Sequence, residues 1–479
     1  MFSHAMNDER SCPRTMKRDI EKLYATMKPW RLFFLVALPG MVSMFAMSIY
    51  SIIEGAFIGQ KLGEGAFAAV NITMPLVMIN FSLADLIGVG ASVPISVSLG
   101  RQDHKTANNI FSCSVILIFV TSVMMGTILF FAAEPLCRMM GANDELLDTS
   151  MRYLRTFALC SPLSTIFFAM DNYLRISGYV KTSMAINIGS NFATIGLLSF
   201  FLLGLDMDVV GSALATSLSM CLCSVIAMIP FLRRKTLLQF TRPHLSKAML
   251  KQIVACGSPV FLNNIAGRVT AILINISLMT LGVQYLGESG GTTAVAAYAV
   301  LMYANEMCQP LMYGTSDALS PAIGYNWGSG DYDRVKKLAK CSYIGTGILG
   351  LFSTATLFFF AHPLASVFAS AKDAAFLALS AHAIQLFGLT YLFRWVSVTT
   401  QSFFSAIEKP VHATVIAVAM ALGFPVLMLG ALWTLGLDGI WLNMVGTSAL
   451  TAILSAVLLL SISREIKKSK KIFQKTIDI

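Results

Sequence analysis

Charged side chains are scarce in this sequence. They make up 13% of the 479 residues, whereas soluble domains carry about 25%. Hydrophobic residues reach 56%, in apolar runs of about twenty residues or more, the length of a membrane-spanning helix. Membrane β-barrels instead alternate polar and apolar residues in strands of about ten residues. We therefore expect an all-α integral membrane protein. The net charge of +10 does not indicate a nucleic-acid partner here.

Several motifs of enzymes and cofactor-binding proteins are also missing. The nine cysteines form no CxxC pair with metal-ligand spacing, and neither HExxH nor GxxxxGK occurs. These absences argue against a metal centre, against direct use of ATP and against an enzyme. We expect no cofactor and no metal. The first thirty residues are basic and have no apolar core before a cleavage site, so we expect no cleavable signal peptide.

Twelve apolar segments predict twelve transmembrane helices. They fall at 31–58, 66–97, 107–133, 153–176, 183–205, 209–232, 252–281, 293–319, 338–361, 375–405, 412–435 and 439–462. Most of the 35 Lys and Arg residues lie in the two tails and the even-numbered loops. Cytoplasmic loops collect these residues, so we expect a multi-pass membrane protein with both termini in the cytoplasm.

The chain divides into two similar halves. We expect a basic tail at 1–30, an N-lobe at 31–232, a basic cytoplasmic linker at 233–251, a C-lobe at 252–463 and a basic tail at 464–479. Gly100 and Gly328 lie at equivalent positions 228 residues apart, as do the pairs Ala68–Ala69 and Ala296–Ala297. Because each repeat has six spans, both copies enter the membrane in the same direction. We expect two lobes related by a pseudo-twofold axis along the membrane normal, as in many secondary transporters.

One acidic residue, Glu54, lies at the end of the first apolar segment, in the stretch YSIIEGAFIG. Tyr50 precedes it by four residues and so shares its helix face. Charges inside membranes are costly, so they are functional candidates by default. No basic residue in the same helix could neutralise Glu54.

The sequence resembles the multidrug and toxic compound extrusion (MATE) antiporters, in particular the bacterial multidrug-exporter branch. The resemblance covers nearly the whole chain. It rests on ALP at 37–39, on the stretch around Glu54, on GSALAT at 211–216, on ILINISL at 272–278 and, most specifically, on SPAIGYNWGSGDYDRVKK at 320–337. It implies export of organic cations in exchange for protons or sodium ions. It also implies that the carboxylate at Glu54 is tied to the coupling ion and to bending of the first helix at Pro39.

The fifth helix departs from the family pattern. Where relatives often have a second acid, counted back from Thr216, this sequence has Leu198, and Thr194 replaces the amide. We therefore expect Glu54, Tyr50, Thr194 and Thr216 to form the ion-coupling site. A sodium ion favours several oxygen ligands, by analogy with other hard cations, whereas one buried carboxylate suffices to carry a proton. The sequence favours proton coupling and leaves sodium possible.

Other membrane-embedded residues are candidates for substrate binding. The acids are Asp85 and Glu306, and Asn275 lies in the seventh helix. Glu306 has an alternative role, as a structural partner of Arg268 or Arg394. Asp171 and Arg175 are spaced as an intrahelical pair, which favours a structural role. Flexible apolar side chains suit promiscuous binding, although each one is more often packing; those that flank the motifs are Met41, Phe45, Met74, Met78 and Met302.

The sequence thus predicts a secondary active multidrug efflux transporter. Its expected partners are small organic cations and the lipid bilayer, with no nucleic acid, and we expect a monomer. A flippase for a lipid-linked precursor and an exporter of an endogenous metabolite are the alternatives. Flippases of the wider superfamily usually have extra spans and a strongly basic cavity, whereas this chain has only two arginines within the spans of its second half.

Overall fold

The computed structural model describes residues 21–368 and 374–477. Residues 1–20 of the expected N-terminal tail and residues 478–479 lie outside this description. Within the described part the chain is helical. It forms two compact units: unit 1 comprises the described residues up to 261 with 318–339 and 406–408, and unit 2 comprises the other described residues.

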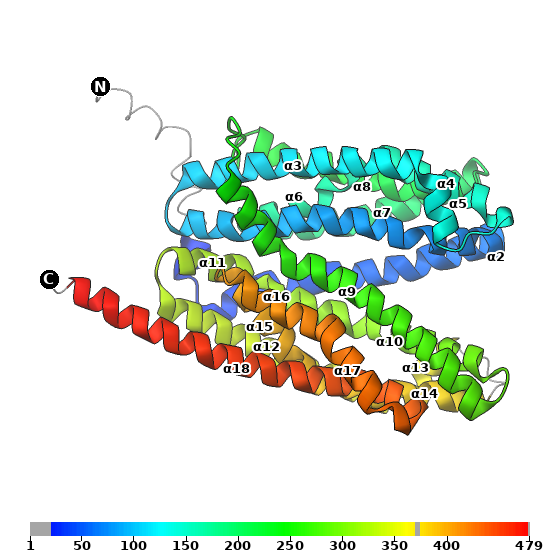
Figure 1. Ribbon diagram of the computed structural model, residues 1–479. Coiled ribbons are helices and arrows are strands. Elements are labelled where there is room, and N and C mark those ends of the chain that lie inside the picture. Colours follow the sequence, from blue (N-terminus) through cyan, green and yellow to red (C-terminus); the bar gives the residue numbers. More distant parts are fainter. Residues whose placement is uncertain (1–20, 369–373, 478–479) are drawn as a thin grey trace. The chain divides into compact units, whose positions relative to one another are not determined.

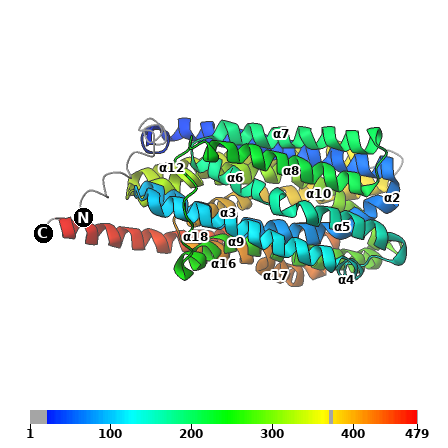
Figure 2. The ribbon, with the colours of Figure 1, turned by 90° about the horizontal axis from the view of Figure 1, so that it is seen from above.

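Unit 1 is a bundle whose long helices lie side by side (Figure 1; Figure 2). Its elements are η2 (Glu21–Thr26), α2 (Pro29–Gly100), α3 (His104–Phe131), α4 (Ala133–Met139), α5 (Asp144–Ser164), α6 (Ile166–Ile176), α7 (Val180–Ser199), η3 (Phe200–Gly204), α8 (Val209–Leu232), α11 (Ser320–Gly328) and the first part of α9 (Lys247–Leu286).

The long element α2 is two membrane-spanning helices in sequence. Its backbone leaves the helical conformation at Gly63, where φ is 86°, a value that glycine adopts at little cost. The two spans run over Pro29–Gly55 and Gly65–Gly100. Side-chain caps define other boundaries: Asp103 accepts a hydrogen bond from the backbone of Thr106, and Asn143 accepts one from Leu146. Such caps satisfy backbone N–H groups that have no partner within the helix.

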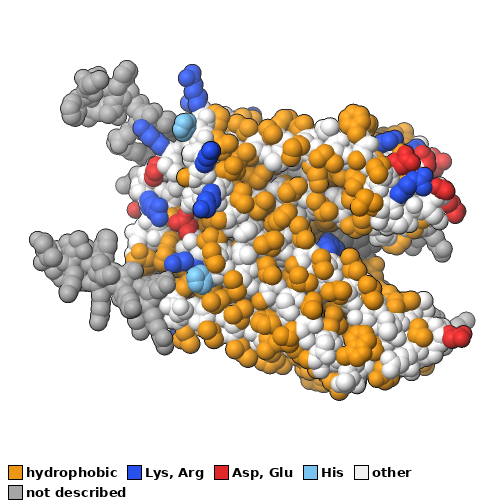
Figure 3. Space-filling view, in the orientation of Figure 1, with side chains coloured by type: hydrophobic (Ala, Val, Ile, Leu, Met, Phe, Trp, Pro, Cys, Tyr) orange, Lys and Arg blue, Asp and Glu red, His pale blue; other side chains and the backbone are white. Residues whose placement is uncertain are grey.

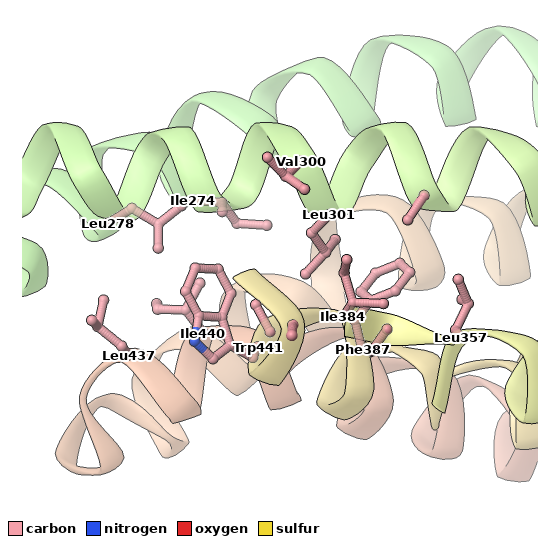
Figure 4. Close-up of a cluster of buried hydrophobic side chains, with 14 of the residues drawn as sticks. Ile274, Leu278, Val300, Leu301, Leu357, Ile384, Phe387, Leu437, Ile440 and Trp441 are labelled. Atoms are coloured by element: carbon pink, nitrogen blue, oxygen red, sulfur yellow. The ribbon is translucent and has the colours of Figure 1, made fainter. Parts of the chain in front are cut away.

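Unit 2 contains the rest of α9 and the helices that follow. They are α10 (Gly290–Ala318), α12 (Tyr332–Phe359), α13 (Ala361–Phe368), α14 (Ala374–Gly388), α15 (Tyr391–Ala406), α16 (Pro410–Val418), η4 (Ala419–Gly423), α17 (Phe424–Ala431), η5 (Trp433–Leu435) and α18 (Leu437–Ile477). Leu301, Phe387 and Trp441 belong to its buried core (Figure 4). These side chains come from helices far apart in the sequence.

The predicted spans correspond to helices throughout the described residues. Ten helices are long and apolar enough to cross a membrane, and the pair α14 and α15 together makes an eleventh. The remaining predicted span, 293–319, coincides with α10, in which Asn305, Glu306 and Gln309 lower the hydropathy. One detail differs: the predicted span 375–405 is not a single helix, because α14 and α15 are bent by 49° at a break after Gly388.

The side chains on the surface are those expected of a membrane protein. In the view of Figure 3, hydrophobic side chains cover the middle of unit 1, and charged side chains gather at its two ends. Exposed residues such as Phe34, Val120 and Phe192 are large and apolar. In water such a surface would be unfavourable, whereas in a bilayer these side chains contact lipid.

Candidate functional site

Glu54 lies at the centre of a hydrogen-bonded cluster inside unit 1. The hydroxyl of Thr216, on α8, donates to Oε1 of Glu54 at 2.8 Å. The hydroxyl of Tyr50 lies 3.2 Å from that of Thr216. Tyr50 also lies within hydrogen-bonding reach of the Glu54 carboxylate itself. The two hydroxyl groups therefore hold one carboxylate and link the end of the first span to α8.

Small residues allow α8 to approach this cluster. Ala213 and Ala215 of the GSALAT stretch are buried, and a side chain at Gly211 would collide with Phe201 and Met207. The start of α8 is fixed by Asp208, which caps the helix through the backbone of Val210. The motif therefore places the Thr216 hydroxyl at hydrogen-bonding distance by removing side-chain bulk on the packed face of α8.

Tyr153 is a neighbour of the cluster that the sequence did not reveal. It is a buried residue of α5, close enough to the Glu54 carboxylate to interact with it electrostatically. Its position could not be read from spacing, because α5 reaches Glu54 only through tertiary packing. The acid thus has hydroxyl partners on α2 and α8, and the buried Tyr153 of α5 lies near it.

Thr194 does not join the cluster. It is buried on α7, where its hydroxyl donates to the carbonyl of Ser190 in the same helix at 2.9 Å. Leu198, at the position where relatives often have an acid, packs against Leu202 and Ala215. Aliphatic packing therefore occupies the place of a second carboxylate.

Asp171 and Arg175 form the intrahelical pair that their spacing predicted. Arg175 Nη2 lies 2.7 Å from Asp171 Oδ2, and both side chains are mostly buried. Two residues of α7 complete the network: Ser183 donates to Asp171, and Asn187 Nδ2 lies 2.6 Å from the same carboxylate. This charge is satisfied by Arg175 of its own helix and by two side chains of α7, which supports a structural role.

Asp85 occupies the second span of α2 and is partly buried. Among the described residues it has no hydrogen-bond or ion-pair partner. The following turn packs closely on α9, because Gly90 faces the backbone of Ile253 and Gly257 faces that of Leu86. Asp85 therefore lies beside a tightly packed helix crossing, separate from the Glu54 cluster.

The flexible apolar candidates differ in their surroundings. Met74 and Met302 pack at the edges of the buried cores of units 1 and 2, respectively. Phe45 and Met78 have exposed fractions of 38% and 37%, and Met41 is partly buried. The first two therefore pack against the cores, and the other three are at least partly accessible to lipid or to a ligand.

Unit 2 carries charges of its own. Glu306 is exposed on α10, and Arg268 of α9 is close enough to attract it. Within the described residues, however, Glu306 forms no ion pair with Arg268 or Arg394. Asn275 is exposed on α9. Across the described residues, no group of three or more His, Cys, Asp or Glu side chains could hold a metal ion.

Comparison with known proteins gives consistent results. The family model MatE matches residues 39–199 and 269–429. The multidrug export protein MepA of Staphylococcus saprophyticus is 25% identical over 386 residues, covering 80% of this chain and 82% of that protein. MepA of Staphylococcus aureus is 26% identical over 436 residues, covering 88% and 92%.

Solved structures show the same fold. A MATE crystal structure in the straight conformation matches with a TM-score of 0.86 at 22% identity, covering 94% of this chain and 99% of that one. The outward-facing conformation of a multidrug resistance MATE family transporter matches with a TM-score of 0.85 at 23% identity, covering 93% and 98%.

The match to the family model, to the multidrug export proteins and to the MATE structures shows that this chain is a transporter and not an enzyme. The chain belongs to the MatE family.

Proposed function

We propose that this protein exports organic cations across the bacterial inner membrane in exchange for protons. The observation that carries the proposal is the cluster in which Thr216 and Tyr50 hold the single carboxylate of Glu54. The MepA relatives are named multidrug export proteins, which supports a drug-like substrate. An organic cation suits a site whose charge comes from a carboxylate.

The proton is favoured over sodium by the composition of the cluster. Glu54, Thr216 and Tyr50 offer one carboxylate and two hydroxyl groups, and Leu198 packs where a second acid would lie. A hard cation held by protein alone needs more oxygens in a closed shell. A proton needs only one basic oxygen, and burial favours the neutral acid.

Protonation would change the hydrogen bonds of the cluster. The charged carboxylate accepts from Thr216 and so ties the first span to α8. A neutral Glu54 accepts more weakly, which frees this end of the span. Pro39 lies inside the same helix, where it removes a backbone hydrogen bond and permits bending. Proton uptake from outside would thus release the substrate, and proton loss to the cytoplasm would restore the cation site.

The remaining assignments complete the proposal. Residues 31–232 and 252–463 form the N-lobe and the C-lobe, and 233–251 links them in the cytoplasm. The linker backbone lies along α3, where Gln239, Thr241 and His244 donate to side chains of that helix. Both termini face the cytoplasm, because the basic segments would lie on that side. The protein acts as a monomer.

The test is substrate-evoked proton release from protein reconstituted in liposomes, measured with and without sodium. Wild-type protein should release protons without sodium, and Glu54→Gln should not, while it remains folded by size-exclusion chromatography. Asp206→Asn serves as the control, because this exposed acid forms an ion pair with Lys61 on the surface. Transport that needs sodium, or proton exchange that survives in Glu54→Gln, would contradict the assignment of Glu54 as the proton carrier.

A further inference from the structure

The stretch SPAIGYNWGSGDYDRVKK at 320–337 has no part in the proposed mechanism. It forms α11, the turn that follows and the start of α12, and all of it belongs to unit 1. Two of its side chains, Asn326 and Arg334, donate hydrogen bonds to the backbone of η2, the short segment that leads into the first span. The stretch therefore contacts the chain just before the helix that carries Glu54.

Arg334 holds this chain at two points. Its Nε donates to the carbonyl of Tyr24 at 2.7 Å, and its Nη2 donates to the carbonyl of Met27 at 2.6 Å. Asn326 adds a third bond, because its Nδ2 donates to the same Tyr24 carbonyl at 3.0 Å. Hydrogen bonds from a charged donor are stronger than those between neutral groups, and the planar guanidinium directs two of them at once. One arginine therefore fixes both η2 and the residues that follow it.

Tyr24 fixes the same segment through its side chain. It is only 3% exposed, and the centroid of its ring lies 6.0 Å from that of Tyr325 on α11. Its hydroxyl donates to the carbonyl of Arg175 on α6 at 2.5 Å. Arg175 is itself held by its ion pair with Asp171. The chain before the first span is therefore bound to two other helices of unit 1.

The first span is packed differently on the two sides of Pro39. Before the proline, the buried residues are Leu32, Phe33, Val36 and Ala37. In residues 40–49, all of which the structure describes, the buried positions are Gly40, Ser43 and Ser48. Apolar side chains therefore fix the helix before the proline. Beyond it, the helix is held mainly by the cluster of Tyr50, Glu54 and Thr216.

This difference decides how the first span can move. Proton binding at Glu54 weakens the bond to Thr216 and so loosens one end of the helix. If the other end were also free, the whole helix would tilt or slide. With that end fixed, the movement has to occur within the helix, and Pro39 is the point where a backbone hydrogen bond is already missing.

We propose that Arg334 anchors the start of the first span, so that proton binding at Glu54 bends the helix at Pro39 instead of tilting all of it. The proposal rests on the proposed proton-coupled export and adds the fixed point that bending requires. Arg334 acts through the backbone of the first span and is therefore a positioning residue. The stretch 320–337 serves to hold that anchor.

Distances between pairs of spin labels test this in protein reconstituted in liposomes. One label replaces Val120 on α3, and the second replaces either Phe34, before the proline, or Ile49, beyond it; all three side chains are exposed. The labels are carried by a noncanonical amino acid, because the nine native cysteines interfere with a thiol label. Distances are measured by double electron–electron resonance, with Glu54→Gln as the mimic of the neutral acid.

The two pairs should respond differently when Arg334 is present. Ile49 lies ten residues beyond Pro39, about 15 Å along the helix, so a kink of about 20° moves it by about 5 Å. Glu54→Gln should therefore shift the distance from Ile49 to Val120 and leave the distance from Phe34 to Val120 unchanged.

Arg334→Gln should free the start of the span. We expect the distribution of the distance from Phe34 to Val120 to broaden, with residue 54 as Glu or as Gln, and the shift at Ile49 to shrink. Arg334→Lys keeps the charge but not the planar fork, so it should restore the narrow distribution only in part. Tyr24→Phe removes one bond and should broaden the distribution less; it preserves the test if Arg334→Gln fails to fold. Lys337→Gln, which neutralises an exposed residue of α12, is the matched control and should change neither distance.

A coupling measurement separates positioning from a general loss of structure. Arg334→Gln should bind the dye ethidium with an affinity within about twofold of wild type. Its rate of ethidium-evoked proton release should fall about tenfold, because proton binding no longer bends the helix. Equal losses of affinity and rate would indicate damage to the whole fold and would contradict a positioning role.

Three results of the distance measurements would overturn the proposal. They are an unchanged Phe34 distribution in Arg334→Gln, equal shifts of both distances on Glu54→Gln, and an Ile49 distance that does not respond to Glu54→Gln although this variant has lost proton release. A failure of the proposed function looks different, because proton release would then survive in Glu54→Gln. The width of the Phe34 distribution in Arg334→Gln would still decide whether the anchor exists.

Discussion

At the residue scale, Thr216 is the side chain that joins Glu54 to α8. Its hydroxyl donates to the carboxylate and lies 3.2 Å from that of Tyr50. Leaving a buried polar group without its partner costs about 1–3 kcal/mol. Loss of the Thr216 hydroxyl should therefore destabilise the charged form of Glu54, because that form accepts this hydrogen bond.

Thr216→Val should therefore impair coupled efflux. The variant keeps the volume and branching of threonine but cannot donate to Glu54. We expect the rate of substrate-evoked proton release to fall about tenfold in liposomes. Thr216→Ser, which keeps the hydroxyl, is the matched control and should retain most of the rate. A valine variant as fast as the serine variant would show that this hydrogen bond is dispensable.

A second prediction concerns Glu408, between α15 and α16 and outside the membrane spans. It lies 3.5 Å from Arg101 and accepts from Gln252 at 2.8 Å. Burial raises the pKa of Glu408 above its ordinary value of 4.5, despite the opposing effects of Arg101 and Gln252. The folded protein therefore favours the neutral acid. The stability that this group contributes is present below the ordinary value and is lost as the pH rises through the raised pKa.

Glu408→Gln should remove this loss of folding stability at high pH, because the amide stays neutral. We expect the melting temperature of the variant to exceed that of wild type by about 1–3 °C at pH 8, and the difference to shrink towards pH 4. The measurement is thermal unfolding in detergent, followed by size-exclusion chromatography, over a pH series. A variant less stable than wild type at pH 8 would mean that the ion pair with Arg101 outweighs burial.

At the element scale, two glycines fix the crossing of α2 and α11. A side chain at Gly100 would collide with the carbonyl oxygen of Tyr325, and one at Gly328 would collide with that of Val97. These glycines hold equivalent positions in the two sequence repeats. Their contacts are reciprocal, so the backbones of α2 and α11 touch without side chains between them.

Gly100→Ala and Gly328→Ala should each destabilise this crossing. A methyl group that meets backbone must displace a helix, which costs about 1–3 kcal/mol. We expect the melting temperature to fall by several degrees. Gly189→Ala on α7 is the control, because its added methyl group would meet nothing within 4 Å, and alanine is the better helix former. Equal effects at the three sites would contradict the close contact.

Hydropathy and spacing were enough to predict the helices. They were not enough to predict how each helix is rotated about its own axis, and so which faces meet. The first two predicted spans, 31–58 and 66–97, bracket the break at Gly63, because apolar length alone marks a bilayer crossing. The Asp171–Arg175 pair also followed from local spacing. The place of Tyr153 beside Glu54 depends on how separate helices turn towards one another, and no local pattern encodes that rotation. Thr194 was expected in the cluster from its place in the sequence, but its hydroxyl donates to a carbonyl of its own helix.

At the scale of the whole molecule, the asymmetry of charge along the chain should set the orientation in the membrane. The segment 233–251 carries six basic residues and no acid, and it adjoins the start of α9. Beyond the connection between α4 and α5, around Gly141, α5 begins instead with Asp144 and Glu145. Lysine and arginine are retained on the cytoplasmic side during insertion, whereas acids contribute little.

We therefore expect residues 233–251 to lie in the cytoplasm and Gly141 to lie outside. Alkaline phosphatase inserted after residue 141 should be active, because the enzyme needs the oxidising exterior to form its disulfides. The same enzyme inserted after Lys235 should be inactive, and a fluorescent protein there should fluoresce. Removing the charge of Arg233, Arg234 and Lys235 together provides the control, since it should weaken this preference. The opposite pattern of activities would mean that the protein has the opposite orientation in the membrane. Proton entry at Glu54 would then drive uptake instead of export.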